Sequence, residues 1–128
     1  MSELTFISPL FIVSSLNDSV AFYVGKLGFK VLYMGPDEDP YFAMVGRGPV
    51  SIMLKGSGTP VPNYTRYEWA RLDAYISAAE PDALFEEYRS AGIVFSQPIR
   101  DDTDGLRGFE LKDADGYVLF FGRPKGNN

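Results

Sequence analysis

The sequence contains neither cysteine nor histidine. Without cysteine the chain has no disulfide, no thiolate metal site and no cysteine nucleophile. Without histidine it lacks the commonest transition-metal ligand and the usual general base near neutral pH. A nucleophilic triad would reduce to serine with lysine, and the nearby pair of these types, Lys55 and Ser57, has no motif around it. The composition therefore indicates no catalytic chemistry of its own.

Basic clusters and long apolar runs are also missing. The net charge is −5 and the twelve Lys and Arg residues are scattered, whereas phosphate binding needs a clustered basic surface. No apolar run approaches the length that spans a bilayer, and residues 1–7 lack the basic segment and apolar core of a secretory signal. We therefore expect a cytoplasmic protein with neither a nucleic-acid partner nor a membrane partner.

What the chain does have is enough apolar surface for one domain core, with 45% hydrophobic and 15% aromatic residues in 128. Its first half predicts a βαβββ module over residues 4–55. A helix is expected over residues 17–27, with Asn17 or Asp18 as its cap and Gly28 as its left-handed stop. The expected strands of this module are residues 5–13, 29–34, 41–45 and 50–54.

The second half predicts the same order of elements. A connecting loop rich in Gly, Ser, Thr, Pro and Asn covers residues 56–68, and the second module covers residues 69–124. Its helix is expected over residues 82–91, after Pro81 and before Gly92. The expected strands are residues 69–77, 94–97, 107–111 and 118–121. An offset of 64 residues places Asp18 on Asp82 and Gly28 on Gly92, which indicates an internal repeat.

Two stretches carry a family resemblance. They are SVAFY at residues 19–23, which runs to LGF at 27–29, and DADGY at 113–117, which leads into VLF at 118–120. These stretches resemble the vicinal oxygen chelate superfamily of glyoxalases, bleomycin resistance proteins and extradiol dioxygenases. The resemblance covers nearly the whole chain and implies a single α+β domain, in which two βαβββ modules form a curved mixed sheet around a cavity. Both motifs are structural and assign no chemistry.

The same resemblance locates four metal-ligand positions. Relatives with a working metal site carry His, Gln or Glu there, whereas this chain has Ser8, Asp73, Phe120 and a position near Lys55. Because a hard divalent ion needs several oxygen or imidazole ligands, we expect no metal and no cofactor. Glu68 or Glu110 would enter the cavity only if the strand phase were shifted by one residue.

Strand alternation suggests which side chains line the cavity. Within the expected strand 69–77, every second residue from Trp69 to Tyr75 shares one face. Arg107 is expected near the cavity mouth because it follows Gly105. The predicted ligand-binding residues are Ser8, Trp69, Arg71, Asp73, Tyr75, Arg107 and Phe120. Other interpretations stay open: Trp69 and Tyr75 as core or interface aromatics, Arg71 with Asp73 as a surface pair, and Arg107 as a solvated side chain.

The favoured hypothesis is a metal-independent protein that binds a small hydrophobic or aromatic molecule by sequestration, close in character to the metal-free bleomycin-resistance branch. That branch implies a homodimer, with the modules paired within a chain or exchanged between chains. One alternative is a metal-dependent lyase, isomerase or dioxygenase that uses Asp73 with Glu110 or Glu68. Another is a remnant without a ligand, its cavity filled by Phe120, Tyr75 and Trp69.

Overall fold

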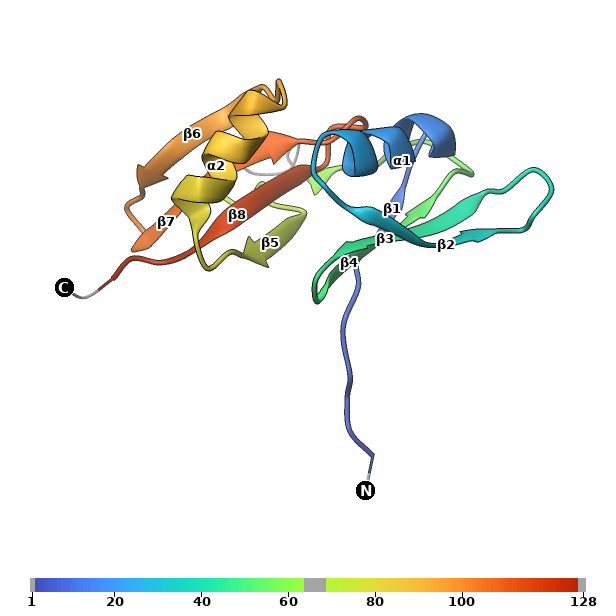
Figure 1. The fold of residues 1–128 in the computed structure, drawn as a ribbon, viewed down its shortest axis with the longest axis horizontal. Helices are drawn as coiled ribbons and strands as arrows, with labels where there is room; N and C mark the ends of the chain where they lie inside the picture. The colour runs from blue at the N-terminus through green and yellow to red at the C-terminus, as the bar shows by residue number, and fades with distance from the viewer. Residues whose placement is uncertain (1, 64–68, 127–128) are drawn as a thin grey trace. The chain divides into compact units, whose positions relative to one another are not determined.

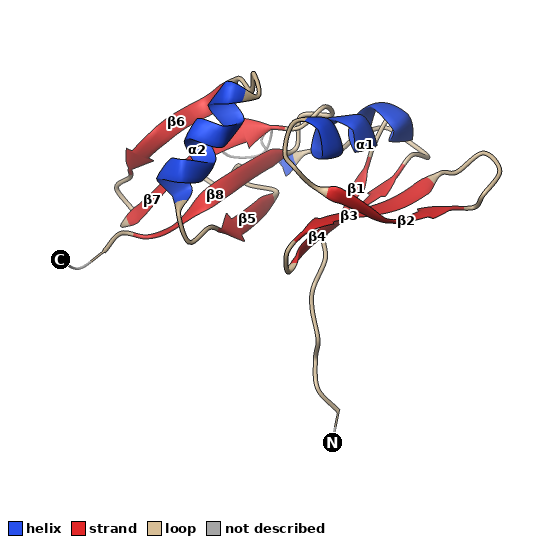
Figure 2. Cartoon of the chain, viewed as in Figure 1, coloured by secondary structure: helices blue, strands red, loops and turns tan. Residues whose placement is uncertain are grey.

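The computed structural model describes residues 2–63 and 69–126 (Figure 1). The chain divides into two compact units, Met1–Val61 and Pro62–Asn128, which we call unit 1 and unit 2. Each unit holds a helix and a four-stranded mixed sheet (Figure 2). The predicted α+β fold with two βαβββ modules is therefore confirmed.

Unit 1 has the strand order β1-β4-β3-β2, with β1 parallel to β4 and the other neighbours antiparallel. The helix lies against one face of this sheet (Figure 2). That face supplies the unit's core, because Phe11, Ala43, Ile52 and Leu54 on it are buried together with Tyr23 of the helix. The elements are β1 (Leu10–Ile12), α1 (Leu16–Gly25), β2 (Lys30–Gly35), β3 (Phe42–Arg47) and β4 (Val50–Lys55).

Unit 2 repeats this architecture in the order β5-β8-β7-β6, with β5 parallel to β8. Its core is aromatic. Phe109 and Phe121 stack with ring centroids 5.3 Å apart, and Tyr88 of the helix meets Phe121 edge-on at 5.5 Å. The elements are β5 (Ala74–Ser77), α2 (Pro81–Ser90), β6 (Phe95–Asp101), β7 (Leu106–Lys112) and β8 (Val118–Pro124).

Two expected strands are shorter than predicted. The first was expected from residue 5, but β1 starts at Leu10, and the exposed residues before it leave unit 1 as an extended segment (Figure 1). Proline at position 9 contributes a carbonyl to Met53 N–H (2.8 Å) but has no N–H of its own to continue the ladder. In unit 2 the strand expected from Trp69 begins only at Ala74. The alternation argued for residues 69–73 therefore does not apply.

The helix boundaries also correct the sequence reading. The cap of α1 is Ser15, whose Oγ accepts the Asp18 N–H at 3.2 Å, and neither Asn17 nor Asp18 caps the helix. Gly28 and Gly92 have φ values of 75° and 86°, as expected for matching left-handed stops. The buried helix tyrosines, Tyr23 and Tyr88, match at an offset of 65 rather than 64. The reason is that the chain has one more residue between Tyr23 and Gly28 than between Tyr88 and Gly92.

The registers of three strands in each sheet match position by position. Leu10 pairs with Met53 in unit 1, as Tyr75 pairs with Phe120 in unit 2. Two residues further on, Lys55 and Gly122 each accept a backbone N–H at 2.9 Å from the residue after the short strand. Met53 therefore corresponds to Phe120, and Lys55 to Gly122. The antiparallel partners extend the match, since Met44 and Glu110 lie opposite Met53 and Phe120, and Phe42 and Gly108 lie opposite Lys55 and Gly122.

Neither helix is a candidate for crossing a membrane. In the parts of the chain that the structure describes, each helix has ten residues, about half of what a bilayer crossing requires.

Candidate functional site

Each sheet has one face that its helix does not cover, which we call the open face of that unit. In unit 1 the buried residues Ala43 and Leu54 point toward α1, so their neighbours Phe42, Met53 and Lys55 point to the open face. Leu10, the register partner of Met53, lies on the same face. The open face of unit 1 is thus largely apolar, with one lysine at its edge.

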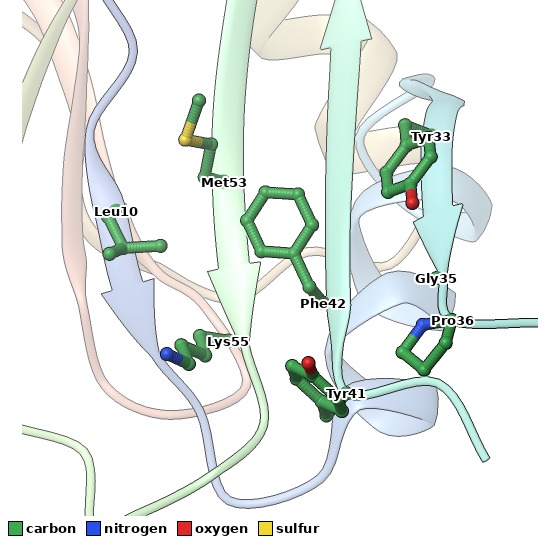
Figure 3. Close-up of a pocket in the computed structure, with 8 residues that line it drawn as sticks. All are labelled: Leu10, Tyr33, Gly35, Pro36, Tyr41, Phe42, Met53 and Lys55. Atoms are coloured by element: carbon green, nitrogen blue, oxygen red, sulfur yellow. The ribbon is translucent and has the colours of Figure 1, made fainter.

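A cavity of about 420 Å³ lies on this open face. Figure 3 shows the ring of Phe42 near its centre, with Leu10 and Met53 on one side and Tyr33 and Pro36 on the other. Tyr33 and Phe42 have ring centroids 6.1 Å apart and planes at 50°. A Cβ on Gly35 would collide with the Tyr33 hydroxyl, so a larger residue at this position would displace the Tyr33 ring. The lining residues are Leu10, Tyr33, Gly35, Pro36, Tyr41, Phe42, Met53 and Lys55.

Lys55 supplies the charge of this pocket, because the rest of the lining contains no Asp, Glu, Arg or further Lys. Its side chain is exposed, and within residues 2–63 and 69–126 no carboxylate lies within ion-pair distance of its ammonium group. The phenols of Tyr33 and Tyr41 are the other polar side-chain groups of the lining. A ligand here would meet aromatic and aliphatic walls and a positive charge.

The open face of unit 2 is filled by its own side chains. Tyr75 and Phe120 stack with centroids 5.5 Å apart and planes at 22°. The Phe120 ring covers two glycines, since a Cβ on Gly122 would lie 2.7 Å from Phe120 Cε2 and one on Gly108 would lie 2.5 Å from its Cζ. Phe120 is buried as a result, although it lies on the face away from α2.

Charge on the open face of unit 2 is compensated internally. Glu110, the register partner of Phe120, forms an ion pair with Arg71, and Ser96 Oγ donates a hydrogen bond to the same carboxylate oxygen at 2.7 Å. The Glu110 side chain is 5% exposed and that of Arg71 31%. A buried carboxylate needs such partners, because desolvation without them is costly.

Asp73 serves a structural role in this geometry. One carboxylate oxygen accepts the Asn63 N–H at 2.8 Å, and the other accepts the Val118 N–H at 2.8 Å. The Asn63 side-chain amide in turn donates to the Leu72 carbonyl at 3.0 Å. Asp73 thereby fastens the segment before β5 to the start of β8.

Sequence comparison decides the family. The sequence model of the Glyoxalase/Bleomycin resistance protein/Dioxygenase superfamily matches residues 6–121. The chain belongs to this superfamily. Among curated protein sequences, none matches the chain with statistical significance.

Solved structures share the fold of this chain. A glyoxylase/bleomycin resistance protein/dioxygenase domain from Frankia sp. EAN1pec is 26% identical, with a TM-score of 0.69 over 100% of this chain and 96% of that one. The bleomycin-binding protein of Streptomyces verticillus, solved with copper(II)-bleomycin, is 22% identical, with a TM-score of 0.70 over 99% and 100% of the two chains. TnmS3, an antibiotic binding protein from Streptomyces sp. CB03234, is 20% identical, with a TM-score of 0.71 over 98% of each chain.

The metal that many superfamily members use does not fit the residues found here. Both carboxylate oxygens of Asp73 already accept backbone N–H groups, and Phe120 offers no donor atom. The metal-ligand position of unit 1 that corresponds to Phe120 was expected near Lys55, but the register places Met53 there, two residues earlier. A thioether and an ammonium are both unsuitable for a hard divalent ion. Among the described residues, no group of three Asp or Glu side chains is placed to hold a metal ion.

The structure brings together only some of the residues that were predicted to bind a ligand. Tyr75 and Phe120 lie side by side, and Arg71 lies on Glu110. Glu110 is the register partner of Phe120 and therefore lies on the open face with it. The shift of one residue that the sequence pattern required for Glu110 is not needed. Trp69 is 82% exposed and precedes β5. Glu68 lies outside the described residues.

Two further predicted residues lie elsewhere. Arg107 alternates with buried Phe109, so it points to the α2 side of its sheet and not to a cavity mouth. There it forms an ion pair with Asp82 at 2.9 Å and one with Asp101 at 3.1 Å, and the hydrogen bond to Asp82 is the main reason that its pKa is raised. Ser8, in unit 1, precedes β1, and its Oγ has no hydrogen-bond partner among the described residues.

The unit 1 pocket was missed by the sequence reading. Alternation within residues 41–45 and 50–54 does separate Phe42, Met53 and Lys55 from the core residues between them. That signal was available, but Lys55 was considered only as a lost metal position and as a partner for Ser57. Tyr33 was less accessible, because β2 is irregular between Val31 and Tyr33 and strict alternation fails there.

Proposed function

We propose that this chain is a metal-independent protein that binds a small hydrophobic or aromatic molecule and holds it by sequestration. The observation that carries the proposal is the pocket on the open face of unit 1. Its volume of about 420 Å³ lies within the range of small-molecule sites, and its lining of aromatic and aliphatic side chains with a few polar groups has their usual character. Binding would bury Phe42 and Met53, which are half-exposed in the structure.

Two fold neighbours support a binding role. One is a bleomycin-binding protein solved with its antibiotic, and the other is an antibiotic binding protein. Their identities to this chain are 22% and 20%, so they support the class of function and not the ligand. The misfit of Asp73 and Phe120 to a metal ion favours binding over the metal-dependent reactions of the superfamily.

We further propose that the protein is a homodimer. Large apolar side chains are exposed in both units, among them Leu4, Ile7, Trp69 and Val94, and such surface commonly marks an association site. Analytical ultracentrifugation at several concentrations should give twice the mass of 14.2 kDa. A monomer at micromolar concentration would contradict the proposal.

The binding proposal is tested by thermal melts with a library of flat aromatic compounds, together with elemental analysis of the purified protein. We expect ligands that raise the melting temperature by several degrees, and no near-stoichiometric metal. Phe42→Ala should abolish the ligand-induced rise, whereas Val24→Ala, an exposed truncation on α1, should preserve it. A specific metal that copurifies and stabilises the protein would favour the enzymatic alternative. No stabilising ligand at all would favour a remnant without a ligand.

A further inference from the structure

The charged side chain of the unit 1 pocket, Lys55, bears on the charge of a ligand. Three side chains of the lining carry polar groups: the ammonium of Lys55 and the phenols of Tyr33 and Tyr41. An ammonium only donates hydrogen bonds, whereas a phenol can donate one and accept one, so the phenols take either kind of partner. The lining contains no carboxylate and no amide side chain. A ligand that offers acceptors and negative charge would therefore pair with the Lys55 ammonium, which would repel the charge of a cationic ligand.

The position of Lys55 on the sheet strengthens this reading. Phe42 is its direct register partner on β3, and Ile12 is its partner on β1, so its backbone is flanked by apolar residues. In unit 2 four of the basic residues, Arg71, Arg89, Arg107 and Lys125, pair with carboxylates, whereas Arg100 and Arg123 pair with none among the described residues. Lys55 differs from those four because no described carboxylate neutralises it.

One acidic segment lies between two residues of the pocket lining in the sequence. Residues 37–39 are Asp, Glu and Asp, between Pro36 and Tyr41 of the lining. The chain that joins Pro36 to Tyr41 leaves on the side of the pocket away from Lys55 (Figure 3). These carboxylates are exposed to water, which screens their effect on a charge held near Lys55.

The shape of the lining favours a flat ring system. Phe42 lies at the centre and Tyr33 stands tilted against it at 50°, while Leu10 and Met53 form the opposite wall. Aromatic rings pack well on tilted or offset partners, and a thioether makes favourable contacts with ring edges. A flat aromatic ring system could therefore stack on Phe42 with its edge toward Met53.

We infer that the ligand of the unit 1 pocket is an organic anion on a flat aromatic ring system, with its carboxylate, sulfonate or phenolate facing Lys55. This inference rests on the proposed binding function and adds the charge class of the ligand. It predicts that charge, and not apolar surface alone, decides which aromatic compounds the protein retains.

The test compares three probes with one ring system and different charges: 2-naphthoate, 2-naphthamide and 2-naphthylmethylammonium. Binding is followed through the ¹³C-labelled methyl group of Met53, with the methyl of Met34, which is not a lining residue, as an internal reference. We expect naphthoate to bind the wild-type protein about fivefold more tightly than the amide, the upper range for a solvent-accessible ion pair. The ammonium probe should bind most weakly, and added salt should reduce the preference.

Variants separate charge from shape. Lys55→Gln should bring the acid and amide affinities to within about twofold, and Lys55→Arg should restore the preference for the acid. Lys26→Gln, a matched loss of an exposed lysine at the end of α1, should leave it unchanged. Phe42→Ala should weaken all three probes alike.

The outcomes distinguish the inference from the proposed function. Equal binding of the three probes to the wild-type protein, or a preference that survives in Lys55→Gln, would overturn the anion inference and leave small-molecule binding intact. If none of the probes shifts the Met53 methyl and none raises the melting temperature, the inference of an aromatic anion fails, while the proposed binding function fails only if the compound library also yields no stabilising ligand.

Discussion

Where β4 carries Lys55 on its open face, the matching position of β8 is Gly122, and where β3 carries Phe42, β7 carries Gly108. In unit 2 the ring of Phe120 lies over this pair of glycines and fills the space. In unit 1 the counterpart of Phe120 is Met53, which lines an open pocket. The same ladder of hydrogen bonds thus supports a hollow face in one unit and a filled face in the other.

The difference shows how a repeated module divides its roles. The strand order is the same in both sheets, and the register of β1, β4 and β3 matches that of β5, β8 and β7, so the backbone of these strands does not decide which face is hollow. Side-chain size at a few open-face positions decides it, together with charge: Lys55 faces the pocket with no carboxylate of the described residues beside it, whereas Arg71 forms an ion pair with Glu110. Unit 2 therefore gains stability from its open face, and unit 1 keeps its own available for a ligand.

The largest expected effect comes from breaking the Arg71–Glu110 pair. Arg71→Ala leaves the Glu110 carboxylate buried with only the Ser96 hydroxyl as a partner. Removal of one partner from a buried pair costs about 3–5 kcal/mol, and partial exposure of Arg71 lowers our expectation to about 2–4 kcal/mol of unfolding free energy. Urea denaturation at pH 7 measures the loss.

The double variant Arg71→Met with Glu110→Leu is the matched control. Replacing both charges with apolar side chains removes the unpaired carboxylate, so its stability should return to within about 1 kcal/mol of wild type. A single variant as stable as the wild type would contradict the view that unit 2 depends on this pair.

A smaller effect is expected when a side chain is added to Gly122, one of the two glycines under the Phe120 ring. A Cβ at Gly122 would lie 2.5 Å from the Arg107 carbonyl oxygen and 2.9 Å from the Gly108 Cα, and neither backbone atom can move aside easily. Gly122→Ala should therefore destabilise the protein by about 1–3 kcal/mol in thermal or urea unfolding.

Gly25→Ala is the control for this change. Gly25 is the last residue of α1, and a Cβ there would meet no atom within 4 Å. Alanine should raise stability by up to about 1 kcal/mol, because it favours the helix. Equal unfolding free energies for Gly122→Ala and Gly25→Ala would contradict the view that Phe120 fills the open face of unit 2 by close packing on its glycines.

The repeat of two modules could be read from the sequence because its signals are local. Helical spacing, Gly28 and Gly92 as stops, and the turn at Asp113 to Gly116 are encoded within a few residues of where they act. Strand ends were harder to predict. The side chain of Asp73 takes two backbone N–H groups, from Asn63 and Val118, and Val118 is 45 residues away, so the irregular chain before β5 depends on tertiary contacts.

The candidate site was harder still, for the same reason. Whether Phe120 lines a cavity or closes it depends on glycines of two different strands, and the partner of Arg71 is 39 residues away. Arg107 shows the limit of arguing from a nearby turn, since its face is set by alternation with Phe109 and by the carboxylate of Asp82 on α2. The apolar hairpin that carries the pocket was predicted as a hairpin, but its open-face residues were not weighed as a binding surface.

The helix caps offer a third test of the comparison. The start of α1 is capped by Ser15, whereas α2 begins after Glu80, which makes no side-chain cap hydrogen bond. Ser15→Ala should cost about 1 kcal/mol. Glu80→Ser should gain a few tenths to about 1 kcal/mol, because serine can accept an N–H group of the first turn. Unfolding of the two variants under the same conditions would show whether the helices differ as the structure indicates, and a destabilised Glu80→Ser would contradict it.

The smallest expected effect concerns the helix-side charges of unit 2. The Arg107 hydrogen bond lowers the pKa of the Asp101 carboxyl, and the positive charge of Lys125 at 3.6 Å acts in the same direction. Because the folded-state pKa is lowered, the contribution of Asp101 to stability is fully present above its unfolded-state pKa of about 4 and is lost as the pH falls through the lower folded value. Carboxyl ¹³C titration should show the Asp101 pKa rising toward its ordinary value in Arg107→Gln and less in Lys125→Gln, because Arg107 is the main cause of the shift. Equal shifts in the two variants would mean that general positive charge, and not the hydrogen bond from Arg107, holds Asp101 ionised.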